Sequence, residues 1–351
     1  MEVTVIVLGD IARSPRMLNH VTCLLSHDFK VRLIGYKDSS LPDDLKDNKN
    51  LKVCLLNSKA LGKFKVLSGK LFILYAFLRL LFESLQLGFY LLGGFRSKVV
   101  LVQNPPSMPV LFVVYLCSCI TGSSVLVDWH NYAWSLLKIA NKSRGIVALA
   151  YYYEWIFGYM ADSGFCVSQN MQTDLKSLRI SADVLYDRPI YRTCSDKDMR
   201  KEFKVNEKTF FLVSSTSWTI DEDFSIVFKA LEVLSATDAS IFLLITGKGP
   251  MREFYMREIE RKNWRNIRVL SAWLEIEDYP AVLKQADLGI CLHTSSSGLD
   301  LPMKVVDMQQ AELPALAFRY KTIHEFVQDG VNGEIFTDYK DLADKISVIC
   351  K

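Results

Sequence analysis

The sequence predicts an α/β protein with two Rossmann-like domains, each built on a doubly wound parallel sheet. Short runs rich in Val, Ile and Leu alternate along the chain with longer segments of helical periodicity. Strands that are apolar throughout and separated by helices are typical of parallel sheets covered by helices on both faces. Right-handed crossovers between such strands then produce doubly wound domains.

A polar segment divides this strand–helix series into two. Residues 187–208, DRPIYRTCSDKDMRKEFKVNEK, carry a proline and many charges, which indicates a connection between domains. We therefore expect an N-terminal domain over residues 1–190, a linker over 191–207 and a C-terminal domain over 208–351. A chain of 351 residues is long enough for two such domains.

The expected strands follow in chain order. In the N-terminal domain they are residues 3–8, 30–35, 52–56, 98–103, 124–129 and 164–168. In the C-terminal domain they are residues 210–215, 240–247, 267–272, 288–293 and 313–318. Parallel sheets bind ligands at the carboxyl ends of their strands, so the residues that follow each strand are the candidates for a site.

Composition narrows the classes of partner. A net charge of +3 is too small to indicate nucleic acid as a partner, and it is compatible with an anionic lipid surface or a phosphate-bearing substrate. The eight cysteines include no C-x-x-C pair, so we expect reduced, mostly buried thiols without a disulfide framework or a metal site.

One segment raises the question of a membrane. No secretory signal opens the chain, and no run of 18 uncharged apolar residues occurs in it. Residues 71–92 are nevertheless densely apolar around most of a helix, interrupted by Arg79 and Glu83. Two interpretations remain open: a helix buried in the core, or a helix that lies in a membrane interface.

The segment LGDIARSPRM follows the first strand. Gly9 would let the chain turn tightly, and Ser14 followed by Pro15 predicts the start of a helix. Arg13 and Arg16 flank that start, which favours an anion site, although an ordinary capped helix explains the same residues. The G-x-G-x-x-G fingerprint is absent here, which argues against a dinucleotide-dependent dehydrogenase.

Polar residues also follow the fourth and fifth strands. Asn104 precedes two prolines, and Asp128, His130 and Asn131 stand together among aromatic residues in DWHNYAWS. Histidine is readily tuned for proton transfer near neutral pH, and aromatic rings beside polar groups suit sugars. A site is therefore predicted here, with a purely structural histidine as the alternative.

The C-terminal domain offers two phosphate-friendly turns. Ser215, Thr216 and Ser217 come after its first strand, where hydroxyls could donate to phosphate oxygens, and the acids of residues 221–223 open the next helix. The next strand leads into ITGKGP, in which Gly247 and Gly249 bracket Lys248. The P-loop spacing is absent from this turn, so the signal is weak by itself.

The segment CLHTSSSGLDLPMKVVDM predicts a strand, a loop and a helix that starts at Pro302. A loop of residues 295–298 before a helix N-terminus can approach a diphosphate closely, with Lys304 one turn into the helix. Asp307 could accept hydrogen bonds from sugar hydroxyls. The alternative is a capped surface helix with a Lys304–Asp307 pair.

Together these motifs resemble one family. VLGDIARSPRM, QNPPSMP, DWHNY, SSTSWTIDEDFSI, ITGKGP and CLHTSSSGLDLPMKVVDM are similar to those of the chitobiosyldiphosphodolichol beta-mannosyltransferases, and the resemblance runs from Val5 to about Lys345. It implies a GT-B fold with two domains facing a cleft. It also implies transfer of the first mannose from GDP-mannose, in beta-1,4 linkage, onto GlcNAc2-diphosphodolichol for N-glycosylation. The anomeric carbon is inverted, and the fold requires neither a metal nor a cofactor.

The reaction that the resemblance implies, together with the positions of the motif residues at strand ends, suggests their roles as a hypothesis. The base that takes the acceptor proton is expected to be His130 first and Asp10 second. The residues expected at the acceptor are Gly9, Arg13, Arg16, Asn104 and Asn131, the two arginines on its pyrophosphate. The residues expected at the donor are Ser215, Thr216, Ser217, Gly247, Lys248, Gly249, Ser296, Ser297, Gly298, Asp300, Lys304 and Asp307.

The sequence departs from related patterns in two ways. Many retaining GT-B enzymes have two glutamates separated by seven residues; Asp307 matches the second, but Leu299 stands at the first position, with Asp300 beside it. Family members commonly begin with a transmembrane anchor and run longer at the C-terminus. Here the chain begins at the first strand, so either the anchor is missing from this version or attachment rests on residues 71–92 and their neighbours. We expect peripheral attachment to the cytosolic face of the endoplasmic reticulum membrane.

Two other functions remain open from the sequence. One is a GT-B transferase that uses another sugar nucleotide or a soluble acceptor. The other is a catalytically silent scaffold assembled with other glycosyltransferases of the dolichol pathway.

Overall fold

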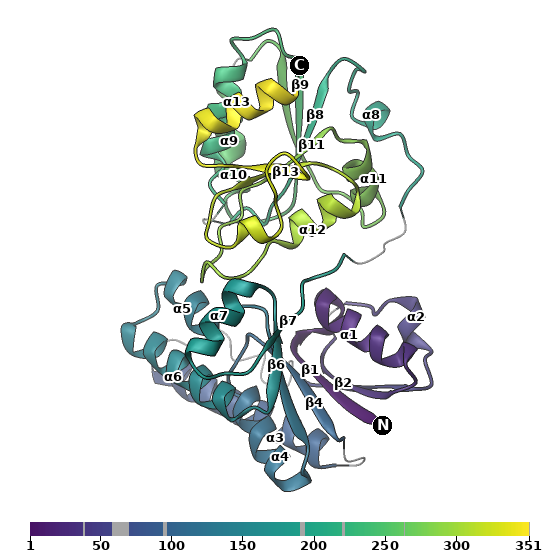
Figure 1. Cartoon of the computed structure of the whole chain (residues 1–351), viewed down its shortest axis with the longest axis vertical. Coiled ribbons are helices and arrows are strands. Elements are labelled where there is room, and N and C mark those ends of the chain that lie inside the picture. The colour runs from purple at the N-terminus through teal and green to yellow at the C-terminus, as the bar shows by residue number, and fades with distance from the viewer. Residues whose placement is uncertain are drawn as a thin grey trace. The chain divides into compact units, whose positions relative to one another are not determined.

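The computed structural model describes residues 1–37, 39–57, 70–93, 97–189, 194–219, 222–262 and 264–350. The chain divides into two compact units, Met1–Arg188 and Pro189–Lys351, each with its own parallel sheet (Figure 1). The predicted α/β class is therefore confirmed for both units.

The first unit contains a seven-stranded sheet in the order β3-β2-β1-β4-β5-β6-β7, in which all neighbouring strands are parallel. All six strands predicted here are present, and β7 escaped prediction because it has only two residues. The strands are β1 (Glu2–Asp10), β2 (Lys30–Tyr36), β3 (Leu51–Leu55), β4 (Val99–Asn104), β5 (Ser124–Trp129), β6 (Ser163–Cys166) and β7 (Asp183–Val184).

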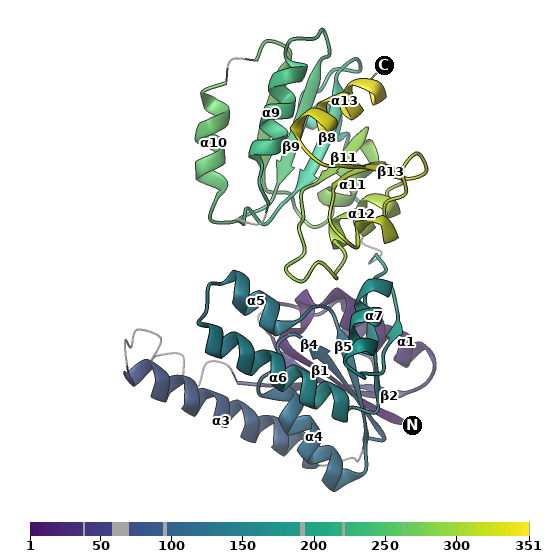
Figure 2. The same ribbon diagram turned by 60° about the vertical axis from the view of Figure 1, so that its left-hand side comes forward.

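Helices cover both faces of this sheet. Its helices are η1 (Ile11–Arg13), α1 (Pro15–Ser26), α2 (Asp43–Lys46), α3 (Lys70–Leu92), α4 (Val110–Thr121), α5 (Ala133–Ile139), α6 (Arg144–Met160) and α7 (Gln169–Ser177). Helix α1 buries Met17, Val21 and Leu25 against one face. On the other face α3, α4 and α6 lie side by side (Figure 2), because the crossovers change face where the strand order reverses.

The second unit contains a six-stranded parallel sheet in the order β10-β9-β8-β11-β12-β13. The five strands predicted here are all present, and β13 was not predicted. The strands are β8 (Phe210–Ser215), β9 (Ile241–Thr246), β10 (Ile267–Ala272), β11 (Leu288–Cys291), β12 (Ala315–Phe318) and β13 (Gly333–Phe336). Its helices are α8 (Met199–Glu202), α9 (Ser225–Leu234), α10 (Arg252–Glu260), α11 (Asp278–Gln285), α12 (Met303–Gln310), η3 (Ile323–Glu325) and α13 (Tyr339–Ile349).

Two apolar clusters hold this second sheet, one on each face. One contains residues of α9 and α13, and the other contains residues of α11 and α12. All six residues of β9 are buried because neighbours cover both of its faces. This double cover explains why the strands are apolar throughout rather than alternating.

The two sheets share one topology. Counted within each unit, the strand order begins 3-2-1-4-5-6 in both. It reverses between β1 and β4 in the first unit and between β8 and β11 in the second. Ligands of such sheets bind where the order reverses, outside the carboxyl ends of the strands.

The linker expected over residues 191–207 needs correction. Residues 190–193 lie outside the described residues. Beyond them, Met199 and Val205 are buried in the core of the second unit, and Met199 begins the short helix α8. The apolar residues of MRKEFKV, which the polar composition of the segment obscured, pack against the second sheet, so this stretch is part of that unit.

Candidate active site

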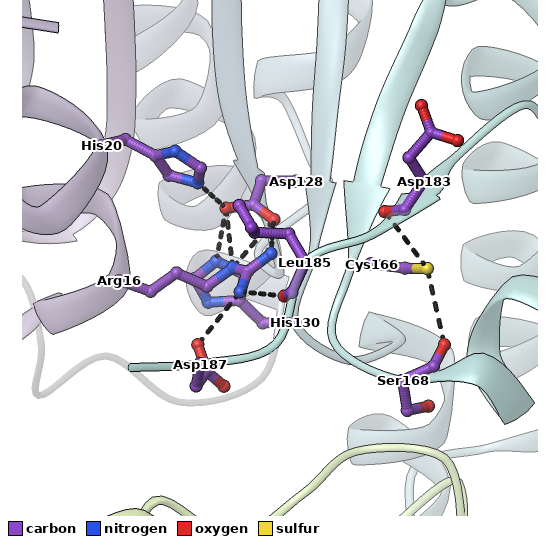
Figure 3. Close-up of polar contacts among 9 residues, drawn as sticks. All are labelled: Arg16, His20, Asp128, His130, Cys166, Ser168, Asp183, Leu185 and Asp187. Atoms are coloured by element: carbon purple, nitrogen blue, oxygen red, sulfur yellow. Dashed lines mark hydrogen bonds and ion pairs between the residues drawn. The ribbon is translucent and has the colours of Figure 1, made fainter. Parts of the chain in front are cut away.

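The carboxyl edge of the first sheet is organised around Asp128, which is fully buried near the end of β5. Arg16 of α1 donates to it from Nε and Nη2 at 2.8–2.9 Å (Figure 3). His20 Nε2 lies 2.8 Å and His130 Nε2 lies 3.2 Å from its Oδ2 atom. Burial by itself would raise the pKa of Asp128, but hydrogen bonds from His130 and His20 and the charge of Arg16 hold that pKa well below its usual range.

The guanidinium group of Arg16 binds partners within the protein. Its side chain is 7% exposed, and Nη1 donates to the Leu185 carbonyl at 2.6 Å and to Asp187 at 3.1 Å. Burial lowers the pKa of Arg16, but the charges of Asp128 and Asp187 outweigh burial and raise it. The anion at Arg16 is therefore the protein's own pair of carboxylates, and not the acceptor pyrophosphate that the sequence predicted.

His130 stands directly after β5, and its backbone N–H donates to the carbonyl of Asn104 at 2.8 Å. Its side chain is 22% exposed, whereas Asp128 beside it is fully buried. A proton on Nε2 satisfies Asp128 and leaves the lone pair on Nδ1. A partly exposed imidazole held by a buried carboxylate is the arrangement that a general base requires.

The loop after β1 differs from its prediction in three details. Gly9 lies within β1 beside a register irregularity, and an added Cβ would meet Val7 at an ordinary 4.0 Å, so no tight turn depends on it. Helix α1 begins at Pro15 as predicted, but the Ser14 hydroxyl donates to Gln103 at 2.6 Å rather than capping it. Asp10 caps η1 and accepts the Ser39 hydroxyl at 2.6 Å, while the Arg13 side chain is 81% exposed.

A second buried carboxylate, Glu154 of α6, supports this edge. It accepts from the backbone N–H groups of Ala133 and Trp134, at 2.8 and 3.1 Å, which open α5. It also accepts from Asn104 Nδ2 at 2.7 Å, and the same nitrogen donates to the Asn131 carbonyl at 3.1 Å. Burial raises the pKa of Glu154, opposed by these hydrogen bonds.

The functional residue that the sequence analysis missed at this edge is Glu154. The two predicted asparagines are connected to it, because Asn104 donates to both Glu154 and the Asn131 carbonyl. Asn104 is fully buried, and the Asn131 side chain accepts the N–H of Tyr132 at 2.7 Å. Both therefore shape the loop that carries His130. The signal that could have found Glu154 is its position as the lone charge in the apolar run YYYEWIFGYM.

In the second unit the equivalent edge is organised around Glu222, which is almost completely buried. Its Oε2 accepts the Thr216 hydroxyl at 2.6 Å and the Ser217 N–H at 2.9 Å. Lys304 of α12 donates to Oε1. Three residues predicted to bind the sugar-nucleotide donor, Thr216, Ser217 and Lys304, thus lie together. The carboxylate that joins them was not singled out by the sequence analysis.

Close packing between two loops explains why both glycines of ITGKG are needed. A Cβ at Gly247 would lie 1.7 Å from the Thr216 carbonyl oxygen, and one at Gly249 would lie 1.7 Å from that of Ser217. The loop after β9 therefore approaches the loop after β8 as only glycine allows. Lys248, between them, places its ammonium 4.0 Å from the ring centre of Trp273, an exposed residue that was not predicted.

The serine loop binds mostly to itself. Ser295 donates to Asp300, and the hydroxyls of Ser295 and Ser297 accept the N–H of Leu299 at 3.1 and 3.2 Å. His293 Nε2 lies 3.3 Å from the second oxygen of Asp300. Short serines close their own turn readily, and contact between this loop and a diphosphate stays a prediction.

The remaining donor candidates keep their status as predictions. Helix α12 begins at Met303 with Pro302 as its N-cap, one residue later than expected. Gly298 adopts a φ of 74°, in the left-handed region that favours glycine. Ser215 accepts the Tyr279 hydroxyl at 3.2 Å. Ser296 lies in the loop before α12, and Asp307 lies within that helix. Their contacts with the sugar nucleotide stay predictions.

In the part of the chain that the structure describes, no three His, Cys, Asp or Glu side chains are grouped so that they could hold a metal ion. None of the described helices combines the length and apolar character needed to cross a membrane.

Comparison with known proteins gives concordant matches. Residues 195–351 match the family described as "Glycosyl transferases group 1". A chitobiosyldiphosphodolichol beta-mannosyltransferase from Mus musculus is 36% identical over 98% of this chain and 80% of its own length. A relative from Arabidopsis thaliana named UDP-glycosyltransferase TURAN is 32% identical over 99% of this chain and 88% of its own length.

Solved structures show the same fold. A sucrose-phosphate synthase from Thermosynechococcus elongatus superimposes with a TM-score of 0.72 at 12% identity, covering 99% of this chain and 89% of that one. The GT-B class expected from the sequence is therefore confirmed at the level of the fold.

Proposed function

Because this chain belongs to the chitobiosyldiphosphodolichol beta-mannosyltransferase family of glycosyltransferases, we propose that it transfers mannose from GDP-mannose to GlcNAc2-diphosphodolichol. The linkage formed is beta-1,4, and the step belongs to the early assembly of the lipid-linked oligosaccharide for N-glycosylation. The observation that carries the chemistry is the His130–Asp128 pair at the carboxyl edge of the first sheet.

His130 acts as the general base in this proposal. The 4-hydroxyl oxygen of the second GlcNAc attacks the anomeric carbon of mannose as its proton passes to Nδ1 of His130. The bond from that carbon to the phosphate oxygen breaks, and its electron pair leaves with GDP. The charge of Asp128 stabilises the imidazolium that forms. Asp10 is the weaker candidate because its carboxylate already caps η1 and holds Ser39.

The second edge binds the donor. Lys304 supplies positive charge for the leaving diphosphate, and Glu222 fixes its ammonium beside Thr216 and Ser217. Lys248 adds a second cation beside the exposed ring of Trp273. Asp300 and Asp307 remain the candidates for contact with ribose or mannose hydroxyls. At the acceptor, both Arg13 and Arg16 were expected to bind the pyrophosphate. Arg13, which is exposed, remains the candidate for that contact.

A membrane surface fits the outer face of α3, α4 and α6. Large apolar side chains there are 57–73% exposed, which rules out the interpretation of residues 71–92 as a helix buried on all sides. We call this the apolar face, and its most exposed members are Phe77, Leu85, Phe89, Ile120, Leu149 and Tyr159. An apolar patch of this kind typically marks an interaction site.

Charge beside the apolar face favours a lipid surface as its partner. Three exposed cations stand between the last turn of α5 and the start of α6: Lys138, Lys142 and Arg144. Exposed Ile139 and Ile146 are near them in the sequence. Cations beside apolar and aromatic residues are typical of peripheral attachment to anionic bilayers. Attachment at the cytosolic face of the endoplasmic reticulum would bring the chain to its lipid-linked acceptor.

The decisive experiment supplies purified protein with GDP-mannose and lipid-linked chitobiose and analyses the product. The proposal expects a trisaccharide with a beta-1,4-linked mannose. Failure with GDP-mannose but transfer from a UDP sugar would replace the proposal with the second candidate, a transferase for another sugar nucleotide. The name of the Arabidopsis thaliana relative, UDP-glycosyltransferase TURAN, favours that candidate. Failure with every donor would favour the remaining candidate, a catalytically silent scaffold.

A further inference from the structure

A pocket of about 520 Å³ lies in the first unit, between α3 and the carboxyl ends of β1 and β2. Leu8 of β1, Tyr36 of β2 and Met108 in the loop after β4 line one side. Residues of α3 between Tyr75 and Glu83 line the other. The volume falls within the roughly 300–1,000 Å³ of ordinary small-molecule sites.

The walls of this pocket are mainly apolar, with a small polar group at one place. Glu83 is buried and accepts from Arg79 Nε at 2.8 Å. That bond uses one nitrogen of a side chain that is 44% exposed, so the outer nitrogens of Arg79 face solvent-accessible space. The Tyr36 hydroxyl is buried beside Glu83 and Arg79.

These groups define the chemistry of a ligand. Burial and then the charge of Glu83 raise the pKa of Tyr36, so its hydroxyl remains a donor. Arg79 is a donor at every physiological pH. Apolar walls beside the partly exposed Arg79 cation match an apolar chain that ends in an anionic group, and a sugar alone would leave the walls without contacts.

The position of the pocket connects it to the proposed chemistry. In the first sheet Tyr36 pairs with Asp10, and Asn104 pairs with Trp129, so the pocket and His130 lie at the same edge. Strand β5, which His130 follows, is two strands from β1. At about 4.8 Å per strand this separation is about 10 Å. A head group of one diphosphate and two sugars spans such a distance.

Helix α3 also connects the pocket to a lipid phase. One side of the helix lines the pocket with Tyr75, Ala76 and Leu80, while Leu85 and Phe89 belong to its exposed apolar face. A lipid chain at that face could therefore enter the pocket along α3 while it remains in contact with apolar side chains.

We infer that this pocket binds the isoprene units next to the diphosphate of a polyisoprenyl-linked acceptor, with Arg79 directed toward the diphosphate end. The inference rests on the proposed function, which supplies a lipid-linked acceptor, and names the part of the protein that recognises the lipid.

The test compares two acceptors that differ only in their chain. One carries a long polyisoprenyl chain and the other a short alkyl chain, both on diphosphate-linked GlcNAc2, and transfer is measured in detergent micelles. Ala76→Trp fills the pocket. The KM for the long-chain acceptor should rise about tenfold or more, because excluding two methylene groups accounts for that factor. The KM for the short-chain acceptor should change less than about twofold.

A matched control uses a different helix of the same unit. Lys176→Trp adds an indole to an exposed position of α7, outside the pocket and the apolar face, and should leave both KM values near those of the unchanged protein. Equal changes for the two acceptors in Ala76→Trp, or no change in either, would overturn the inference.

A second measurement does not depend on transfer. Farnesyl diphosphate that carries a benzophenone is photo-crosslinked to the unchanged protein, and the labelled peptides are mapped. Labelling of residues 75–83 or 105–109, lost in Ala76→Trp, supports the pocket, and labelling elsewhere or none contradicts it. A protein that labels in this pocket but transfers no mannose would refute the proposed function alone.

Discussion

The carboxyl edges of the two sheets have the same strand order but use their buried carboxylates differently. At the first edge Asp128 binds Arg16, His20 and His130, and Arg16 is shared with Asp187. At the second edge Glu222 binds one cation, Lys304, together with a hydroxyl and a backbone N–H. Topology fixes where a site can form, but the partners of the central carboxylate decide what it can do.

This difference separates a proton-transfer site from an anion site. The first edge uses its guanidinium internally and presents a histidine held by a carboxylate. The second edge presents an ammonium beside hydroxyl and amide donors, which suits a diphosphate. If this contrast is correct, substitutions at the two edges should affect different properties.

Asp128→Asn should produce the largest effect. The change replaces one of the two carboxylates that Arg16 contacts with a neutral amide and leaves Asp187 as the other. Removing one member of a buried pair costs about 3–5 kcal/mol of unfolding free energy. Urea denaturation followed by circular dichroism measures that loss. Asp183→Asn, an exposed carboxylate in the same unit, is the control and should change stability by less than about 0.5 kcal/mol.

The same pair of proteins tests the charge of Asp128 through pH. Because its folded-state pKa is depressed, its contribution is complete above the unfolded value near 3.9 and is lost as the pH falls through the folded value. Arg16, His20 and His130 face this carboxylate. The unchanged protein should therefore lose stability on acidification below about pH 4 more steeply than Asp128→Asn. Parallel curves would show that the carboxylate is not held charged.

His130→Ala should come next and should affect turnover. Loss of a general base lowers kcat by about 10² to 10⁴. The KM for GDP-mannose should be nearly unchanged because donor binding is assigned to the other edge. Steady-state transfer kinetics and a thermal melt separate catalysis from folding. Near-normal turnover with folding intact would remove His130 as the base.

Lys304→Ala should mainly weaken donor binding. A hydrogen bond to a charged group is worth about 1.5–3 kcal/mol, so the apparent affinity for GDP-mannose should fall about tenfold to a hundredfold. Titration with GDP-mannose measures this directly. Lys284→Ala removes an exposed lysine from α11 of the same unit and should have no effect. An unchanged affinity in Lys304→Ala would refute its assigned role.

Trp273→Ala should have the smallest effect. The indole face positions the Lys248 ammonium through a cation–π contact worth about 0.5–1 kcal/mol at an exposed site. The affinity for GDP-mannose should fall about twofold to fivefold, while Trp273→Phe should retain most of it. An affinity equal to that of the unchanged protein in both variants would place this pair outside the donor site.

Local patterns were sufficient for much of the fold. The runs IFLLI and VVLV are apolar at successive positions and rich in β-branched residues, which is typical of a strand covered on both faces, and they form most of β9 and β4. Polar residues at the strand ends located both edges. Patterns failed where a role depends on a distant partner. Glu154 and Glu222 look like ordinary helix-associated acids until folding buries them against loops from elsewhere in the chain.

The sequence by itself determined the alternation of strands and helices, the parallel sheets and the polar residues at their ends, because burial on two faces requires continuous apolar runs. Tertiary structure decided which charges meet. Arg16 is 112 residues from Asp128, and Lys304 is 82 residues from Glu222. A charge shows its sign in the sequence, but its interaction energy depends on distance and burial. Only folding could therefore decide that Arg16 is bound internally, whereas Lys304 lies beside the hydroxyl and amide donors.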